Sequence, residues 1–183
     1  MPTELAIAGA NPRDRARVLL DCWAQGNLYC PNCSSDKLNR DNGRTGQLRC
    51  PGCRSRFEIQ GQPGPFDQYI AAGPFDSVRC AMGDRRLSGR FYLHYDPRVW
   101  IVRDLLLVPG FAIPEPAMRR RGSRRHFALD QIPAQARIAL VITIKSSSPG
   151  GTECLMISRP REVREKFRRL KPRKAKVAGP LPD

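Results

Sequence analysis

The sequence lacks the features that would place it in a membrane or direct it to secretion. No apolar run approaches the ~20 residues that a membrane-spanning helix needs. Residues 1–10 have neither the basic start nor the long apolar centre of a secretory leader. We therefore expect no membrane partner, although an anionic membrane would attract a basic chain as nucleic acid does.

Histidine is scarce, and the common catalytic motifs are missing. The only histidines are His94 and His126. There is no serine–histidine–aspartate order, no glycine-rich phosphate loop and no H-E-x-x-H helix. His94 lies in an alternating segment and is interpreted as a structural or surface residue, whereas His126 follows an arginine cluster and could contact phosphate. The sequence offers little for catalysis by these routes.

Acidic residues are also few, with 17 Asp and Glu against 32 Lys and Arg, which gives a net charge of +15. The basic residues cluster: residues 159–183 hold ten Lys or Arg and three acids. Arginine suits bidentate contact with phosphate and guanine, so nucleic acid is the first candidate partner. A solvated surface kept soluble by its charge is the alternative. The candidate nucleic-acid contacts are Arg119, Arg120, Arg121, Arg124, Arg125, Arg168 and Arg169.

Four of the seven cysteines form two C-x-x-C pairs. Sixteen residues separate the pair Cys30 and Cys33 from the pair Cys50 and Cys53. This spacing is typical of a structural zinc site, in which two tight knuckles each supply two thiolates. Pro31 and the Pro51-Gly52 pair suit such turns, because proline fixes φ and glycine permits positive φ. Two disulfides or four buried thiols are the alternatives.

The other three cysteines, Cys22, Cys80 and Cys154, are scattered along the chain and odd in number. They are interpreted as small buried apolar residues. This cysteine usage indicates a reducing, intracellular compartment.

The apolar patterns predict helices near both ends and strands in the middle. The first helix opens at Asn11-Pro12, an N-cap followed by proline, and Leu19, Leu20 and Trp23 continue an apolar stripe from Ala16. The further expectations are strands at 47–49, 56–60, 90–96, 99–108 and 137–144, a helix within 66–83, a long basic loop at 111–130 and a helix at 158–170. The fold class is therefore mixed α and β.

The strands at 47–49 and 56–60 bracket the second cysteine pair and place Glu58 on their polar face. Metal-dependent phosphodiester cleavage uses two carboxylates that converge on Mg²⁺, with a lysine to position or activate the water. Here Glu58 is the single acid, and Gln60 occupies the position where the lysine would lie.

These residues carry a family resemblance. It begins with D-C-W-A-Q-G-N-L-Y-C-P-N-C and continues with C-P-G-C-R-S-R-F-E-I-Q, F-Y-L-H-Y, L-L-L-V-P-G-F, D-Q-I-P, R-I-A-L-V and P-R-E-V-R-E-K-F. The chain resembles the Dam-replacing (DpnI) family of restriction endonucleases, which cut adenine-methylated duplex DNA. The likeness extends to about residue 170.

The resemblance implies a PD-(D/E)xK restriction-endonuclease-like fold with an inserted four-cysteine zinc hairpin at residues 29–54. It implies one nuclease-type domain at 1–170, followed by a basic tail at 171–183 that is expected to be disordered. We expect the chain to lack the C-terminal winged helix of full-length members. A bacterial cytoplasmic, nucleoid-associated location also follows from the resemblance.

Carried over residue by residue, the family's first acid falls at or next to Gln47, its glutamate corresponds to Glu58 and its lysine to Gln60, a position where some nucleases of this fold tolerate glutamine. The first hypothesis is a protein that binds adenine-methylated duplex DNA, with cleavage weakened or lost, and with zinc as its structural cofactor. The second is an active endonuclease that uses Mg²⁺ and a relocated acid, Asp41. The third is a zinc-stapled structural or interaction module.

Overall fold

The computed structural model describes residues 11–41, 46–71, 87–121, 124–144 and 154–172. Helices and strands alternate irregularly in these segments, which confirms the mixed α+β class. The elements are α1 (Pro12–Asn27), β1 (Asn39–Arg40), β2 (Gln47–Arg49), β3 (Arg56–Gln62), β4 (Tyr69–Ala71), β5 (Leu87–Asp96), β6 (Ile101–Pro109), η2 (Gly110–Ala112), η3 (Glu115–Ala117), β7 (Met118–Arg121), β8 (Arg124–Ala128), η4 (Leu129–Gln131), η5 (Ala134–Ala136), β9 (Ile138–Ile144), β10 (Cys154–Ile157) and α3 (Pro160–Leu170). None of the helices in these segments is long and apolar enough to cross a membrane.

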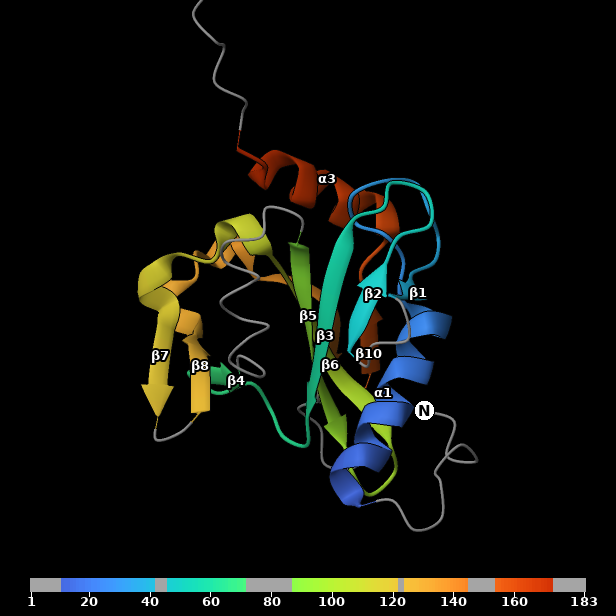
Figure 1. Cartoon of the computed structure of the whole chain (residues 1–183), viewed down its shortest axis with the longest axis vertical. Coiled ribbons are helices and arrows are strands. Elements are labelled where there is room, and N and C mark those ends of the chain that lie inside the picture. The colour runs from blue at the N-terminus through green and yellow to red at the C-terminus, as the bar shows by residue number, and fades with distance from the viewer. Residues whose placement is uncertain (1–10, 42–45, 72–86, 122–123, 145–153, 173–183) are drawn as a thin grey trace, which may run out of the picture.

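Seven strands form the main sheet in the order β1-β2-β3-β5-β6-β9-β10. Only β3 and β5 are paired in parallel, whereas the other neighbours are antiparallel. A parallel pair needs a long crossover between its strands, and β4 lies within that connection. This mixed sheet runs through the middle of the molecule (Figure 1) and is consistent with a restriction-endonuclease-like fold.

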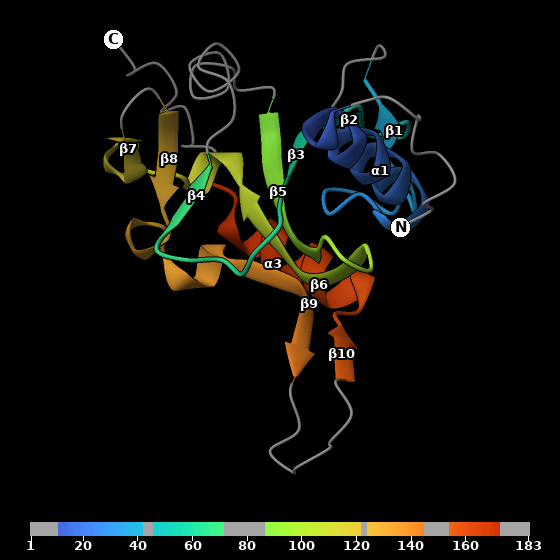
Figure 2. The ribbon, with the colours of Figure 1, turned by 90° about the horizontal axis from the view of Figure 1, so that it is seen from below.

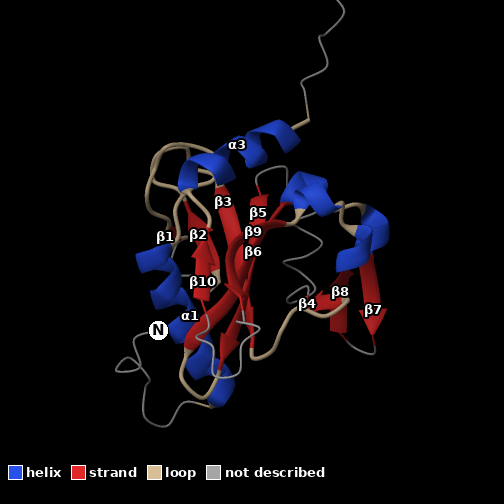
Figure 3. Cartoon of the chain, turned by 180° about the vertical axis from the view of Figure 1, so that it is seen from behind, coloured by secondary structure: helices blue, strands red, loops and turns tan. Residues whose placement is uncertain are grey.

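Each face of the main sheet is covered by a different layer. One apolar cluster joins α1 and α3 to the sheet through residues such as Leu20, Phe57 and Phe167. A second cluster, which includes Tyr92 and Phe127, joins the opposite face to a small sheet of order β4-β8-β7. Viewed from below, α1 and the small sheet lie on opposite sides of β3 and β5 (Figure 2). Strands dominate the middle of the molecule, and α1 and α3 flank them (Figure 3).

The first helix matches its prediction closely. The Asn11 side chain accepts a hydrogen bond from the Asp14 backbone N–H at 3.0 Å, which confirms the N-cap. Leu19 and Leu20 are buried in the predicted stripe. The strand β3 crosses α1 at Gly61, where a Cβ would lie 2.5 Å from Leu20 Cδ1. Glycine therefore permits a close approach of the strand to the helix, and β3 runs two residues further than predicted.

The prediction of a long basic loop at 111–130 was wrong. This segment contains β7 and β8, which pair with each other in antiparallel register. Phe127 supplies the reason, because its buried ring anchors β8 against the main sheet and the arginine-rich strand pairs with it. Charge density indicated exposure, but it did not exclude a strand with one buried face.

One other expectation about the elements needs correction, and one strand was not predicted. The predicted helix within 66–83 is wrong where it can be checked, since Tyr69–Ala71 is the strand β4; the rest falls in 72–86, outside the described residues. The strand β10 was not predicted. The expected tail at 171–183 is described only to residue 172, so the domain division remains a prediction.

Candidate metal centre and nuclease strands

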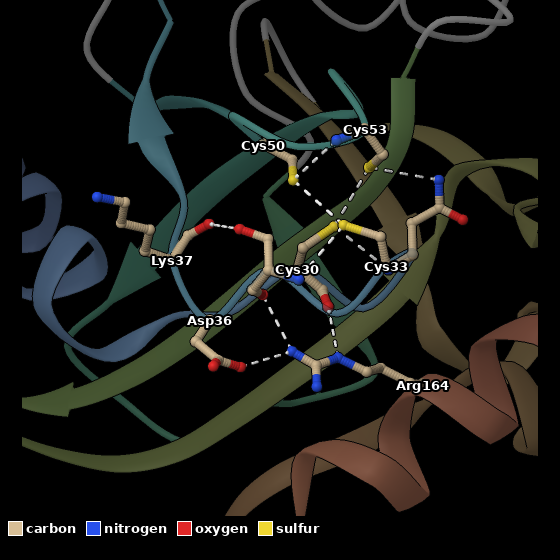
Figure 4. Close-up of polar contacts among 9 residues, drawn as sticks. Cys30, Cys33, Asp36, Lys37, Cys50, Cys53 and Arg164 are labelled. Carbon is tan, nitrogen blue, oxygen red and sulfur yellow. Dashed lines mark hydrogen bonds and ion pairs between the residues drawn. The ribbon is translucent and has the colours of Figure 1, made fainter.

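The four predicted cysteines come together in one cluster. The ligand atoms of Cys30, Cys33, Cys50 and Cys53 all lie within 4.8 Å of one another (Figure 4). Cys30 Sγ lies 3.6 Å from Cys53 Sγ, and Cys33 Sγ lies 3.5 Å from Cys50 Sγ. A tetrahedral zinc ion with Zn–S bonds of ~2.3 Å would hold its sulfurs ~3.8 Å apart. The cluster therefore fits a structural zinc ion.

The two halves of the cluster have matching backbone geometry. The backbone N–H of Cys30 donates to the Ser35 carbonyl at 3.0 Å, and that of Cys50 donates to the Ser55 carbonyl at 2.9 Å. Backbone N–H groups also point at the sulfurs, with Asn32 N 3.4 Å from Cys30 Sγ and Cys53 N 3.4 Å from Cys50 Sγ. Such N–H donors favour thiolates, the form that binds metal.

Gly52 does not adopt the positive φ that glycine permits. The left-handed residue in the second knuckle is Arg54, with φ of 59°, and the positive-φ glycine among the described residues is Gly46, with φ of 76°. Gly52 instead lies close to the site, because its missing Cβ would be 3.7 Å from Cys33 Sγ. This distance is an ordinary van der Waals contact, so a small side chain would fit there.

The sulfur atoms are not bonded to each other. Their separations of 3.5 and 3.6 Å far exceed a disulfide bond of about 2.05 Å, so the disulfide alternative does not hold. Burial raises the pKa of the Cys30 thiol. Burial opposes ionisation of Cys53 too, but hydrogen bonds with Ser55, Cys30 and Cys33 outweigh it and lower the pKa to about 6. A bound cation would offset the cost of placing a thiolate at buried Cys30.

Glu58 is buried and paired with an arginine. Gln47 of β2 and Arg90 of β5 are its register partners on either side. Arg90 Nε donates to Glu58 Oε2 at 2.9 Å, and the two residues are 1% and 7% exposed. The guanidinium also lies over the Phe127 ring, 5.0 Å from its centroid. The face of β3 that was predicted to be polar is thus covered by the small sheet.

Two buried polar groups, one of the pair itself and one of its neighbour, have no hydrogen-bond partner among the described residues. They are Arg90 Nη2 and the Tyr92 hydroxyl. Burial raises the pKa of Tyr92, so the hydroxyl stays neutral. Gln60 is half-buried opposite Tyr92 in the register. The three positions carried over from the family thus lie on adjacent strands, next to a buried basic residue.

Asp41, the relocated acid of the second hypothesis, lies close to these strands. Its backbone N–H donates to the Gln47 carbonyl at 2.9 Å. Its carboxylate, however, pairs with Arg56 at 3.1 Å and with Arg49 at 3.8 Å. Within the described segments, the four cysteines are the one group of three or more potential metal ligands.

The candidate arginines lie on three elements, the paired strands β7 and β8 and the helix α3. Arg119 is exposed on β7, which also carries Arg120 and Arg121, while β8 carries Arg124 and Arg125. In the hairpin register Arg120 pairs with Arg125 and Arg121 with Arg124. Arg168 and Arg169 are exposed in the last turn of α3. Among the described residues, α3 and β7 occupy different regions of the molecule (Figure 1).

Two arginines with structural roles were missed. Arg90 precedes an apolar alternating run, and only its cross-strand position identifies Glu58 as its partner. Arg164 lies in a helix rich in charge, where nothing local distinguishes it from its neighbours, yet it contacts the first cysteine knuckle. Of the leftover cysteines, Cys22 is half-buried and unbonded, and Cys80 lies outside the described residues.

A comparison with protein families agrees with these observations. The model of the Dam-replacing family, DpnI, matches residues 2–149 of the 183. The matched span includes all four clustered cysteines and the three positions at Gln47, Glu58 and Gln60.

Proposed function

The chain belongs to the Dam-replacing (DpnI) family, and we propose that it binds adenine-methylated duplex DNA through a nuclease-type fold whose active site is degenerate. Family membership supports a restriction-endonuclease-like, DNA-binding protein. The net charge of +15 supports the same partner. The proposal adds two claims that family membership and charge do not supply: that the chain recognises methylated adenine, and that it has lost cleavage.

The pairing of Glu58 with Arg90 is the observation that carries the loss of cleavage. Mg²⁺ needs oxygen ligands in near-octahedral geometry and keeps several waters. Arg90 already donates to Glu58 Oε2 at 2.9 Å in a buried environment. A fixed positive charge at that distance repels a second cation and neutralises the carboxylate that would attract it. Glu58 therefore acts as an internal counter-ion.

The other two positions contribute no charge to a cation site. Gln47 and Gln60 are amides where the family has an acid and a lysine. Asp41 is close in the chain, but its carboxylate faces Arg49 and Arg56. Together these residues leave Mg²⁺ without a second charged ligand and the attacking water without a lysine.

The cysteine cluster is proposed to hold structural zinc, with Cys30, Cys33, Cys50 and Cys53 as the ligands. Zinc bound there would cross-link the segment before β1 to the turn between β2 and β3. It would stabilise the strands that carry Gln47 and Glu58 and would take no part in chemistry. Elemental analysis of purified protein should find one zinc per chain.

The cleavage proposal is tested with adenine-methylated and unmethylated plasmid in Mg²⁺ or Mn²⁺. We expect no cutting of either plasmid. Cutting that disappears in Glu58→Ala would support the active-endonuclease hypothesis instead. The inactivity could come from the pairing of Arg90 with Glu58 or from the two glutamines. A Gln47→Asp/Gln60→Lys variant separates these two causes, because it should remain inactive if Arg90 blocks the site. Restored cutting in that variant would assign the inactivity to the two glutamines alone.

The binding proposal is tested by fluorescence anisotropy with matched methylated and unmethylated duplexes. We expect tighter binding to the methylated duplex and a steep loss of affinity as salt rises, since several phosphate contacts release counterions. Arg119→Ala is expected to weaken binding to both duplexes. Equal affinity for the two duplexes would refute methyl recognition, and no binding at low salt would favour an interaction module.

A further inference from the structure

Arg164 connects the last described helix to the first cysteine knuckle. Its Nε donates to the Cys30 carbonyl at 3.1 Å, and its Nη2 donates to the Ser35 carbonyl at 3.0 Å. Nη2 also lies 3.0 Å from Asp36 Oδ1. Figure 4 shows the guanidinium beneath the cysteines, with its nitrogens pointing at these oxygens. Arg164 lies beyond residues 2–149, the part of the chain that the family model matches.

The two hydrogen bonds to carbonyls contribute more to holding the Arg164 side chain than the ion pair with Asp36 does. The Arg164 side chain is 19% exposed, whereas that of Asp36 is 89% exposed, so water weakens their attraction. The guanidinium also lies over the Tyr29 ring, 5.3 Å from its centroid. A planar guanidinium that stacks on a ring and donates in its own plane is held in one orientation.

The carbonyls that Arg164 contacts define the knuckle itself. Ser35 O accepts from Cys30 N at 3.0 Å and from Arg164 Nη2 at 3.0 Å. This hydrogen bond between Cys30 and Ser35 closes the loop that contains Cys33. Arg164 therefore stabilises the loop from Cys30 to Ser35, which sets the distance between the sulfurs of Cys30 and Cys33.

A second route, from the C-terminal end of the same helix, reaches the other knuckle. Lys171 Nζ donates to Asn32 Oδ1. The Asn32 amide in turn donates to Ser55 Oγ at 2.6 Å and points at Cys53 Sγ at 3.8 Å. Contacts from the α3 region thus reach both cysteine pairs.

We propose that Arg164 is a positioning residue of the metal centre, which couples retention of the metal to the docking of α3. The proposal rests on metal binding by the four cysteines. Hydrogen bonds around a metal site orient its ligands, and their loss typically costs 10–100-fold in affinity. Because Arg164 spans from α3 to the knuckle, loss of the metal should also loosen the helix.

The test measures zinc release from the full chain to a chromogenic chelator. Arg164→Ala should release zinc about 10–100-fold faster than the wild type. Arg164→Lys should rescue only in part, because one ammonium cannot donate as a planar fork to both carbonyls. Arg161→Ala is the matched control, since it removes an exposed arginine from the same helix and should leave the rate unchanged.

A further variant separates positioning from simple loss of stability. Ile70 is buried in the small sheet, on the face of the main sheet opposite α3, so Ile70→Ala should destabilise the protein without changing the docking of α3 or the knuckle. If Ile70→Ala releases zinc as fast as Arg164→Ala, or if Arg164→Ala releases zinc at the wild-type rate, the proposal is overturned. Protein that binds no zinc at all would also overturn it, whatever its affinity for DNA.

Hydrogen exchange provides the reciprocal readout. Chelation of zinc from the wild-type chain should increase exchange at the backbone amides of residues 160–170. Zinc-loaded Arg164→Ala should show the same increase while its main sheet remains protected. Unchanged protection of α3 in both samples would contradict the coupling.

Discussion

The buried ion pair of Glu58 and Arg90 is expected to contribute strongly to the free energy of unfolding. Glu58→Gln leaves the guanidinium without its counter-charge, and Arg90→Met leaves the carboxylate alone. Each single change should lower the free energy of unfolding by about 3–5 kcal/mol, the usual cost of breaking a buried pair from one side. The double variant should lose much less than the sum of the two.

The magnitude follows from the burial and the distance. Oppositely charged groups ~4 Å apart attract by about 4 kcal/mol at an effective dielectric constant of ~20, and the contact here is 2.9 Å between atoms that are almost fully buried. Phe127 covers the guanidinium, so Arg90 has no direct route to water on that side. We therefore expect a coupling energy of at least about 2 kcal/mol in the double-mutant cycle.

Chemical denaturation in excess zinc measures this coupling, with Trp23 and Trp100 as intrinsic fluorescent probes. The exposed pair of Glu165 and Arg169 supplies a matched control, and its cycle should give a coupling below about 1 kcal/mol. Additive effects at Glu58 and Arg90, or single costs below about 1 kcal/mol, would refute the assignment of Glu58 as a buried counter-ion.

Three other perturbations have defined outcomes. Gly61→Ala places a Cβ 2.5 Å from Leu20 Cδ1 and should cost about 1–3 kcal/mol, read from the urea midpoint. Asp21→Ala removes the acceptor of the Gly46 N–H at 2.9 Å and should cost about 1–3 kcal/mol, whereas Asp21→Asn should cost less. Burial raises the pKa of Asp21, so the stability of the wild type relative to Asp21→Asn should fall as the pH rises above about 3.9. Cys50→Ser should abolish zinc binding and lower the thermal midpoint, measured by calorimetry with added zinc.

Features encoded by local spacing could be predicted from the sequence. The cysteine cluster follows from two C-x-x-C pairs, because each pair fixes its own knuckle within four residues. The start of α1 follows from Asn11 and the apolar stripe behind it, and the pairing of Gln47 with Glu58 follows from the short turn between β2 and β3. In each case the deciding contacts lie within about 25 residues.

The contacts that neutralise Glu58 and hold the first cysteine knuckle join segments far apart in the chain. Arg90 reaches Glu58 across 32 positions, and Arg164 reaches Cys30 across 134. Neither arginine differs from other arginines in its local pattern. The strands β7 and β8 were missed for a related reason, since the burial of Phe127 depends on the main sheet and not on the neighbouring arginines.

If cleavage is lost as proposed, the two arginines explain how the fold persists without it. In an active nuclease site of this kind, acids that converge on one cation repel each other until that cation binds. Here the single acid carries a permanent internal counter-charge in Arg90, so the strands β3 and β5 need no divalent cation to remain paired. The first cysteine knuckle is held from α3 by Arg164.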